Sequence, residues 1–365
     1  MLRIGMMGLP GCGKTSLFRA LTGVTAHVGT GGKREVHVGQ ARVPDGRLSE
    51  LNGVFRRPRQ VNAVVEYVDV VGFASGDARR AGFRESAAVW EDQFLGDIRT
   101  CDALLHVLRC FEAPGLPAPD PMRDFRAAEA EILISDQIIL EKRQCRLQKD
   151  LQKHPTPEGK AEQELLKRCL EGLNAEKPLR TLSIPPPERP FLKAYQPLSI
   201  KPQLVVLNVA EADIRNEAQI VARYRPQIEG PEVQVSAACA SIEMEIAELD
   251  AESAKEFMAD LGIESSALDR LVRASYQLLG LISFFTVGDE ECRAWTVRKG
   301  LTAREAAGAV HTDMERGFIR AEVVNFADFQ PRGSFAACRH DGVLKLEGKE
   351  YIVQDGDIIQ FRFAV

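Results

Sequence analysis

LRIGMMGLPGCGKTSLFRAL, residues 2–21, is the stretch that decides the fold of this 365-residue chain. Its first six residues are mostly apolar, which is typical of a short buried strand, and its last six residues favour a helix. Between these parts, residues 8–15 match G-x-x-x-x-G-K-[ST], a glycine-rich loop whose backbone amides surround phosphate groups. A match between a strand and a helix predicts a P-loop, with the helix N-terminus facing the phosphates.

The residues of this loop have separate predicted roles. We expect Lys14 to bridge the β- and γ-phosphates of a nucleoside triphosphate and the Thr15 hydroxyl to ligate Mg²⁺. The predicted nucleotide-binding residues of the loop are Gly8, Gly11, Cys12, Gly13, Lys14, Thr15 and Ser16.

A second motif follows a β-rich stretch at residues 63–68, which ends in the D-x-x-G sequence of residues 69–72. In a P-loop NTPase this strand lies beside the first one. Its aspartate reaches Mg²⁺, usually through water, and its glycine amide senses the γ-phosphate. Asp69 is therefore a predicted metal ligand, and Asp69 and Gly72 are predicted γ-phosphate sensors. Phe73 follows directly and has no donor or acceptor with which to orient an attacking water.

A third motif lies where P-loop GTPases recognise the base of the nucleotide. The apolar strand at residues 203–207 ends in Asn208-Val209-Ala210-Glu211, at the place where GTPases carry N-K-x-D. The aspartate of that motif accepts hydrogen bonds from guanine, whereas Glu211 is one methylene longer and adenine presents a different edge. These residues compromise guanine recognition but do not by themselves show that adenine replaces it. The predicted base-side residues are Asn208, Val209, Glu211, Ser236 and Ala237, the last two in a loop after a strand at 232–235.

The composition excludes several classes of protein. No apolar run is long enough to span a membrane, and the opening apolar stretch is too short for a signal peptide. The eight cysteines form no C-x-x-C pair, which argues against a zinc site and a disulfide framework and predicts a cytoplasmic protein. The net charge of −5 gives no bulk support for nucleic-acid binding. We expect a monomer with no membrane or DNA partner.

A change of pattern marks residues 121–178. Leu133, Leu140 and Leu147 recur every seven residues, and Leu166 and Leu173 repeat the interval after a break at residues 154–159. This spacing predicts an antiparallel helical hairpin with coiled-coil-like packing.

Three further residues invite a chemical role. His106 lies in an apolar strand and His311 lies near a helix end, so we interpret both as structural rather than catalytic. Cys12 lies in the phosphate loop at a helix N-terminus, where a thiol should have a lowered pKa. Oxidation of such a thiol would obstruct phosphate binding. The alternative is a small side chain chosen for packing.

Together these motifs resemble the Obg-like ATPase (YchF) family of P-loop NTPases. The shared residues include the start of the P-loop, the D-x-x-G, residues 106–111 and residues 208–211. The most specific matches lie in the last 85 residues, among them 317–322 and 351–357.

The resemblance implies an α/β fold with three parts. These are an Obg-type G domain at residues 1–120 and 197–280, an inserted antiparallel helical hairpin at 121–196, and a β-grasp (TGS) domain at 281–365. Read directly, residues 281–297 predict a β-hairpin, and Thr302 and Glu305 predict a capping box. Four stretches predict further strands: 319–324, 344–346, 351–353 and 358–363. The resemblance also implies hydrolysis of ATP in preference to GTP, with Mg²⁺, and association with the ribosome or ribosomal RNA.

Departures from the family pattern leave three hypotheses. Lys33 occupies the place of the family's magnesium-sensing threonine, although Thr30 is close, and no catalytic residue is assigned. The first hypothesis is a slow ATPase that acts as a switch on the ribosome. The second is a GTPase of the same fold, because Glu211 retains a carboxylate. The third is a nucleotide-binding regulatory scaffold with little turnover, which Lys33 and Phe73 would permit.

Overall fold

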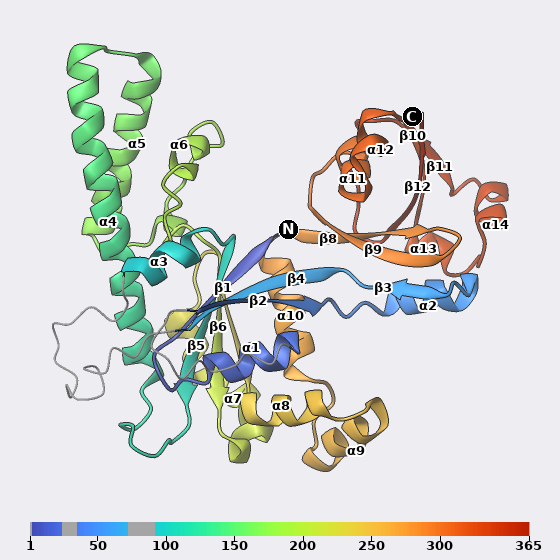
Figure 1. Ribbon diagram of the computed structural model, residues 1–365, viewed down its shortest axis with the longest axis horizontal. Helices are drawn as coiled ribbons and strands as arrows, with labels where there is room; N and C mark the ends of the chain where they lie inside the picture. The colour runs from blue at the N-terminus through green and yellow to red at the C-terminus, as the bar shows by residue number, and fades with distance from the viewer. Residues whose placement is uncertain (1, 24–34, 72–91, 365) are drawn as a thin grey trace. The chain divides into compact units, whose positions relative to one another are not determined.

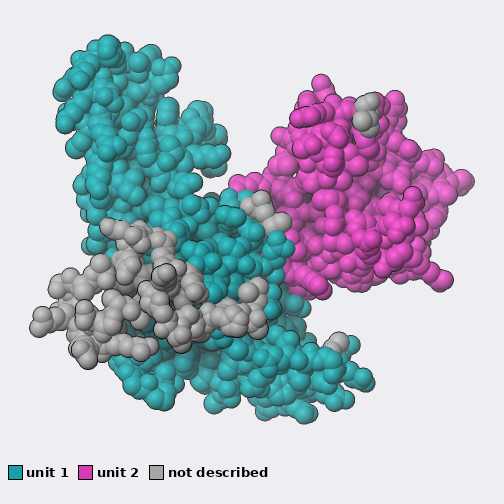
Figure 2. Space-filling view, viewed as in Figure 1, with its two compact units in different colours: residues 1–40, 66–271 teal, residues 41–65, 272–365 magenta. Residues whose placement is uncertain are grey.

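The structure, a computed structural model, describes residues 2–23, 35–71 and 92–364. The chain forms two compact units, one of residues 1–40 and 66–271 and the other of residues 41–65 and 272–365 (Figure 2). The predicted domains were divided differently, with residues 1–120 together, and their boundaries stay a prediction. Among the described residues, no helix combines the length and the apolarity needed to cross a membrane.

The first unit is built on a six-stranded sheet with the order β2-β4-β1-β5-β6-β7 (Figure 1). The strands are β1 (Arg3–Met7), β2 (Glu35–Arg42), β4 (Val64–Val71), β5 (Ala103–Cys110), β6 (Gln203–Val209) and β7 (Val233–Ala238). From β4 through β1, β5 and β6 to β7, each strand is parallel to its neighbour. The loops after β1, β4 and β6 therefore open at one edge of the sheet, where nucleotides bind in such folds.

Helices cover both faces of this sheet. The helices of this unit are α1 (Lys14–Thr22), α3 (Asp92–Arg99), α4 (Pro121–Lys153), α5 (Pro157–Asn174), α6 (Arg189–Lys193), α7 (Glu217–Ile228), α8 (Ala240–Glu248), α9 (Ala251–Leu261) and α10 (Ala267–Leu278), of which α10 begins in it, with 3₁₀ turns η1 (Leu179–Thr181) and η2 (Glu211–Asn216). Phe94 of α3 and Ile132 of α4 pack in one core cluster with Met7 of β1. Ile242 of α8 packs in another with Val205 of β6, against which α7 also lies.

The predicted helical hairpin is confirmed by α4 and α5, which run side by side (Figure 1). Each helix begins at a capping side chain followed by proline: Asp120 accepts from the Arg123 amide at 3.0 Å, and Thr156 accepts from the Gly159 amide at 3.1 Å. The leucines predicted at seven-residue spacing are all buried in the core between the helices. Arg143 and Glu162 join the two helices by a bidentate ion pair at 2.7–2.8 Å.

The second unit contains a six-stranded sheet with the order β11-β10-β12-β8-β9-β3. Its elements are α2 (Gly46–Phe55), β3 (Arg59–Val61), β8 (Leu281–Val287), β9 (Glu291–Arg298), α11 (Ala303–Val310), α12 (Thr312–Arg316), β10 (Phe318–Asn325), α13 (Phe326–Phe329), α14 (Phe335–His340), β11 (Lys345–Glu347) and β12 (Asp357–Phe363). The hairpin of β8 and β9 and the Thr302–Glu305 capping box are present as predicted. The strand predicted at 351–353 is wrong, because Ile352 forms only an isolated bridge with Thr302.

Candidate nucleotide-binding site

The predicted P-loop connects β1 to α1. Gly11 and Gly13 have φ angles of 80° and 87°, in the left-handed region that favours glycine. A Cβ atom on Gly13 would also lie 2.1 Å from Asn208 Nδ2, so no other residue fits there without displacing that side chain. Gly13 is the N-cap of α1, and Leu17 N donates to its carbonyl at 3.0 Å. The glycines thus shape the tight turn that places the amides of the loop at the helix N-terminus.

Three predicted side chains meet beside this loop. Parallel pairing of β1 with β4 aligns Met6 with Asp69, so the carboxylate comes next to the start of α1. Lys14 Nζ donates to Asp69 Oδ1 and, at 3.0 Å, to the Val70 carbonyl. Thr15 Oγ1 donates to Asp69 Oδ2 at 3.1 Å. The Asp69 side chain is completely buried, so the Lys14 ammonium compensates a charge that would otherwise be costly.

The same residues fit the coordination of Mg²⁺. Mg²⁺ prefers hard oxygen ligands and, in nucleotide sites, takes one or two from the protein and the others from phosphates and water. The Thr15 hydroxyl and the Asp69 carboxylate supply two oxygens of this kind within hydrogen-bond distance of each other. The part of the chain that the structure describes holds no cluster of three or more His, Cys, Asp or Glu side chains suited to a metal. The predicted ligand pair therefore suits a metal shared with a nucleotide.

Asn208 connects the P-loop to the loop after β7. Its Nδ2 donates to the Cys12 carbonyl at 2.9 Å, and its Oδ1 accepts from the Ala240 amide at 3.0 Å. The side chain is buried, and both of its polar ends are engaged by backbone. Asn208 is therefore a positioning residue that holds two loops of the site in register. The sequence had assigned it only to nucleotide binding.

An open pocket of about 780 Å³ adjoins the P-loop, in the size range of small-molecule sites. Five predicted residues line it: Gly13, Ser16, Asn208, Val209 and Glu211. The sequence did not identify the other lining residues, which are Phe111, Glu112, Ala210, Ala212, Ala240, Ser241, Met244, Glu245 and Glu248. Four of the lining side chains are glutamates, so the pocket is rich in acceptors for the amino and ring N–H groups of a base.

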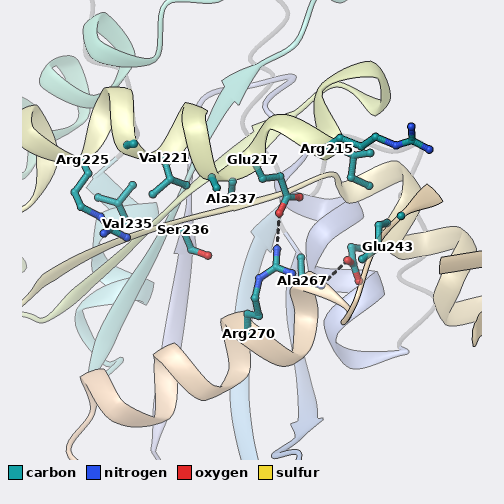
Figure 3. A pocket seen from close by; sticks show the side chains of 15 residues that line it. Arg215, Glu217, Val221, Arg225, Val235, Ser236, Ala237, Glu243, Ala267 and Arg270 are labelled. Carbon is teal, nitrogen blue, oxygen red and sulfur yellow. Dashed lines mark hydrogen bonds and ion pairs between the residues drawn. The ribbon is translucent and has the colours of Figure 1, made fainter. Parts of the chain in front are cut away.

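The structure does not bring Ser236 and Ala237 to this pocket. Both lie inside β7, where they pair with Val206 and Leu207 of β6, and they line a different pocket (Figure 3). The strand was predicted to end at residue 235, but it continues to Ala238. The loop at the nucleotide pocket consequently starts three residues later, at Cys239 and Ala240.

Several predicted residues lie outside the described part of the chain. They are Gly72, with the neighbouring Phe73, and Thr30 and Lys33, so their predicted roles stay predictions. The two histidines are structural, as interpreted. His106 is completely buried, and burial lowers its pKa to about 3. His311 caps α12, its Nδ1 accepting from the Asp313 amide at 3.2 Å.

The hypothesis of a reactive Cys12 is wrong for this structure. Only 3% of the residue is exposed, and burial raises the pKa of its thiol to about 11, outweighing the nearby Lys14 charge and a backbone hydrogen bond. A helix N-terminus lowers a thiol pKa where water still reaches the sulfur, whereas desolvation of the thiolate dominates here. The small side chain instead fills space beside Gly8, where a Cβ atom would lie 2.6 Å from its sulfur.

We therefore expect Cys12 to resist alkylation at neutral pH. With a pKa of about 11, roughly one thiol in ten thousand is ionised at pH 7, so iodoacetamide should modify exposed Cys145 at least about 100-fold faster. Mass spectrometry of tryptic peptides after timed labelling measures both sites in one sample. Comparable rates at the two cysteines would contradict the burial argument.

Comparison with known proteins gives consistent matches. Residues 281–364 match the family model YchF-GTPase_C, described as a protein of unknown function (DUF933). The chain is 38% identical to the ribosome-binding ATPase YchF of Bacillus subtilis (strain 168), with 100% of each chain covered. It is 37% identical to the ribosome-binding ATPase YchF of Haemophilus influenzae, covering 100% of this chain and 99% of the relative. The solved structure of the Schizosaccharomyces pombe YchF GTPase matches with a TM-score of 0.84 at 26% identity, over 99% of this chain and 97% of that one. The predicted fold class is confirmed.

Proposed function

Because the chain belongs to the YchF family of P-loop NTPases, we propose that it hydrolyses ATP in preference to GTP, with Mg²⁺, as a slow switch on the ribosome. The observation that carries the proposal is the meeting of Lys14, Thr15 and Asp69 beside the P-loop. The ribosome is the proposed partner because the relatives from Bacillus subtilis and Haemophilus influenzae are named ribosome-binding ATPases. Such a partner implies a cytoplasmic location.

In the proposed complex, the chain's own groups position and neutralise the triphosphate. The amides of the P-loop and the N-terminus of α1 bind the phosphate oxygens, and Lys14 contacts the β- and γ-phosphates. Thr15 and Asp69 would hold Mg²⁺, which when bound supplies further neutralisation of phosphate charge. Hydrolysis then depends on holding a water in line with the γ-phosphate and on stabilising the charge of the transition state. The low rate is proposed from the sequence, because Phe73 after the D-x-x-G has no donor or acceptor with which to orient that water.

The proposed ATP preference has support from the base side of the pocket. Val209 and Glu211 replace the lysine and the aspartate of the guanine-binding motif, and both line the pocket beside Asn208. Glu211 lies at the start of η2, and its carboxylate is one methylene farther from the backbone than the aspartate would be. A second candidate, GTP hydrolysis, is favoured by the retained carboxylate and by the naming of the Schizosaccharomyces pombe structure as a GTPase.

We expect MgATP to bind at least about tenfold more tightly than MgGTP, because a misplaced acceptor weakens pairing with the guanine N–H groups. Isothermal titration of the full chain with each nucleotide measures the two dissociation constants. Equal affinities, or tighter binding of MgGTP, would favour the second candidate. Phosphate release with and without ribosomes then separates a switch from a scaffold, since a scaffold shows no turnover in either condition.

A further inference from the structure

A second pocket, of about 520 Å³, lies in the first unit apart from the P-loop (Figure 3). Its walls come from α7, β7 and α10, with contributions from α8 and from the segment around Gly262. None of its lining residues lines the nucleotide pocket. Ser236 and Ala237, which the sequence assigned to the base, lie here. The volume falls within the range of sites that bind small molecules.

One part of the lining is apolar. Val221 of α7, Val235 of β7 and Ile263 contribute branched side chains, and alanines from α7, β7 and α10 lie between them. The small alanine side chains leave room for a ligand body. The apolar part of the lining therefore suits a flat or compact hydrocarbon group.

The charged residues of the lining are unequally compensated. Arg270 donates to Glu217 at 2.5 Å and to the Ser265 carbonyl at 3.0 Å. Glu243 is buried and accepts from the Ala267 amide and the Ser266 hydroxyl, both at 2.6 Å. These two carboxylates are thus already engaged by the protein.

The charge of Arg225 is only weakly compensated. Its Nε lies 3.9 Å from Glu229, and both side chains are about half exposed, so this pair contributes little. Arg215, also in the lining, donates to the carbonyls of Leu261 and Asp260 and faces no carboxylate there. Since the lining holds three arginines and two glutamates, it carries one more cation than anions.

Ser236 adds a polar group at the floor of the pocket. In Figure 3 its hydroxyl is drawn between the side chains of Arg225 and Arg270, which enter from α7 and α10. Its strand position is fixed by the pairing of β7 with β6. A hydroxyl and arginine side chains that line the same pocket are a combination suited to the oxygens of a phosphate or carboxylate group.

From this arrangement we propose that the pocket binds a small amphipathic anion, a molecule with one phosphate or carboxylate group attached to an apolar body. The anionic group is held by the guanidinium of Arg225 and the Ser236 hydroxyl. The apolar body packs on Val221, Val235 and Ile263. The site is separate from the P-loop and does not depend on nucleotide hydrolysis.

Direct binding of simple probes to the full chain tests this proposal. The probes are phenyl phosphate, benzoate, inorganic phosphate and benzyl alcohol, titrated by ligand-observed NMR. Phenyl phosphate and benzoate separate a phosphate from a carboxylate ligand, and at least one of them should bind saturably. Inorganic phosphate lacks the apolar body and benzyl alcohol lacks the charge, so each should bind at least about tenfold more weakly.

Variants locate the binding. Arg225→Gln should weaken the bound probe at least about tenfold, and Ser236→Ala about threefold or more. Arg223→Gln is the matched control, because Arg223 is an exposed arginine on the same helix that does not line the pocket. It should change binding less than about twofold, as should Lys14→Gln, which removes the P-loop charge and is expected to stay folded. Circular dichroism confirms that each variant is folded.

Four results would each overturn the proposal. They are no saturable binding of either aromatic anion, unchanged binding by Arg225→Gln, inorganic phosphate binding as tightly as phenyl phosphate, and loss of binding in Lys14→Gln. The last result would assign the probe to the P-loop.

Discussion

Replacing Lys14 with alanine is expected to lower ATP turnover by about 100-fold or more. The ammonium is the side-chain cation of the P-loop, and the proposed reaction relies on charge neutralisation at the γ-phosphate. Loss of one preorganised charged contact to a transition state typically costs two to three orders of magnitude. Release of inorganic phosphate from MgATP, measured with and without ribosomes, gives the rate, and isothermal titration gives the affinity.

The Lys14 variant also changes the protein's own charge balance. Lys14 is paired with Asp69, which is completely buried, so alanine leaves an uncompensated carboxylate and is expected to destabilise the first unit by about 3–5 kcal/mol. Lys14→Gln is the more selective variant, because its amide still donates a hydrogen bond to Asp69 while the charge is removed. It should stay folded and lose turnover to a similar extent.

Lys160→Ala serves as the matched control for both variants. Lys160 is an exposed lysine on α5, and its removal should change neither turnover nor folding measurably. If folded Lys14→Gln hydrolyses ATP at the wild-type rate, the assignment of Lys14 to the β- and γ-phosphates is wrong, and so is the proposed function.

The P-loop could be predicted because its chemistry is contiguous. A strand, a glycine-rich turn and a helix follow one another in residues 2–21, and the structure has β1, the loop and α1 there. Asp69 was also predictable, since a β-rich run ends next to it and parallel pairing brings it to Lys14. In each case a local sequence pattern identifies the residue.

The residues on the base side of the site were harder to predict, because the end of β7 is determined by its pairing with β6. Residues 236–238 are small and have no strong strand preference, yet pairing with β6 extends the strand to Ala238, opposite Asn208. The bridging role of Asn208, between residues 12 and 240, likewise depends on contacts that no local pattern encodes. The same holds for β3, a three-residue strand that joins β9 more than 200 positions later.

Cys12 shows where a local rule yields to burial. The rule that a helix N-terminus lowers a thiol pKa assumes access to water, and sequence does not report how deeply a residue of a turn is packed. Here the pKa is raised to about 11 because the thiol is enclosed. The alternative stated from sequence, a small residue chosen for packing, agrees with the contact between its sulfur and Gly8.

The largest expected loss of stability outside the P-loop follows from Asp136→Ala. Asp136 lies on α4 and is completely buried. It accepts from Arg99 of α3 at 2.7 Å and from the amides of Leu198 and Ser199 at 2.9 and 2.7 Å. One carboxylate thus connects the helical hairpin, α3 and the segment that returns to β6. Alanine removes all three hydrogen bonds and leaves Arg99 without its carboxylate, so the free energy of unfolding should fall by about 3–5 kcal/mol.

Two measurements and two further variants make this prediction specific. Urea unfolding followed by circular dichroism reports the loss of stability, and hydrogen exchange should accelerate at the Leu198 and Ser199 amides. Asp136→Asn keeps an acceptor but loses the charge and should cost less, about 1–3 kcal/mol.

Asp150→Ala removes an exposed carboxylate from the same helix and should stay within about 0.5 kcal/mol of wild type. If Asp136→Ala behaves like this control, the hairpin is held to the sheet by apolar packing of residues such as Ile132 and Phe94, and the buried charge contributes little. A paired buried charge is costly to break even when the pair adds little net stability. Asp136→Ala and Asp136→Asn must therefore be compared directly.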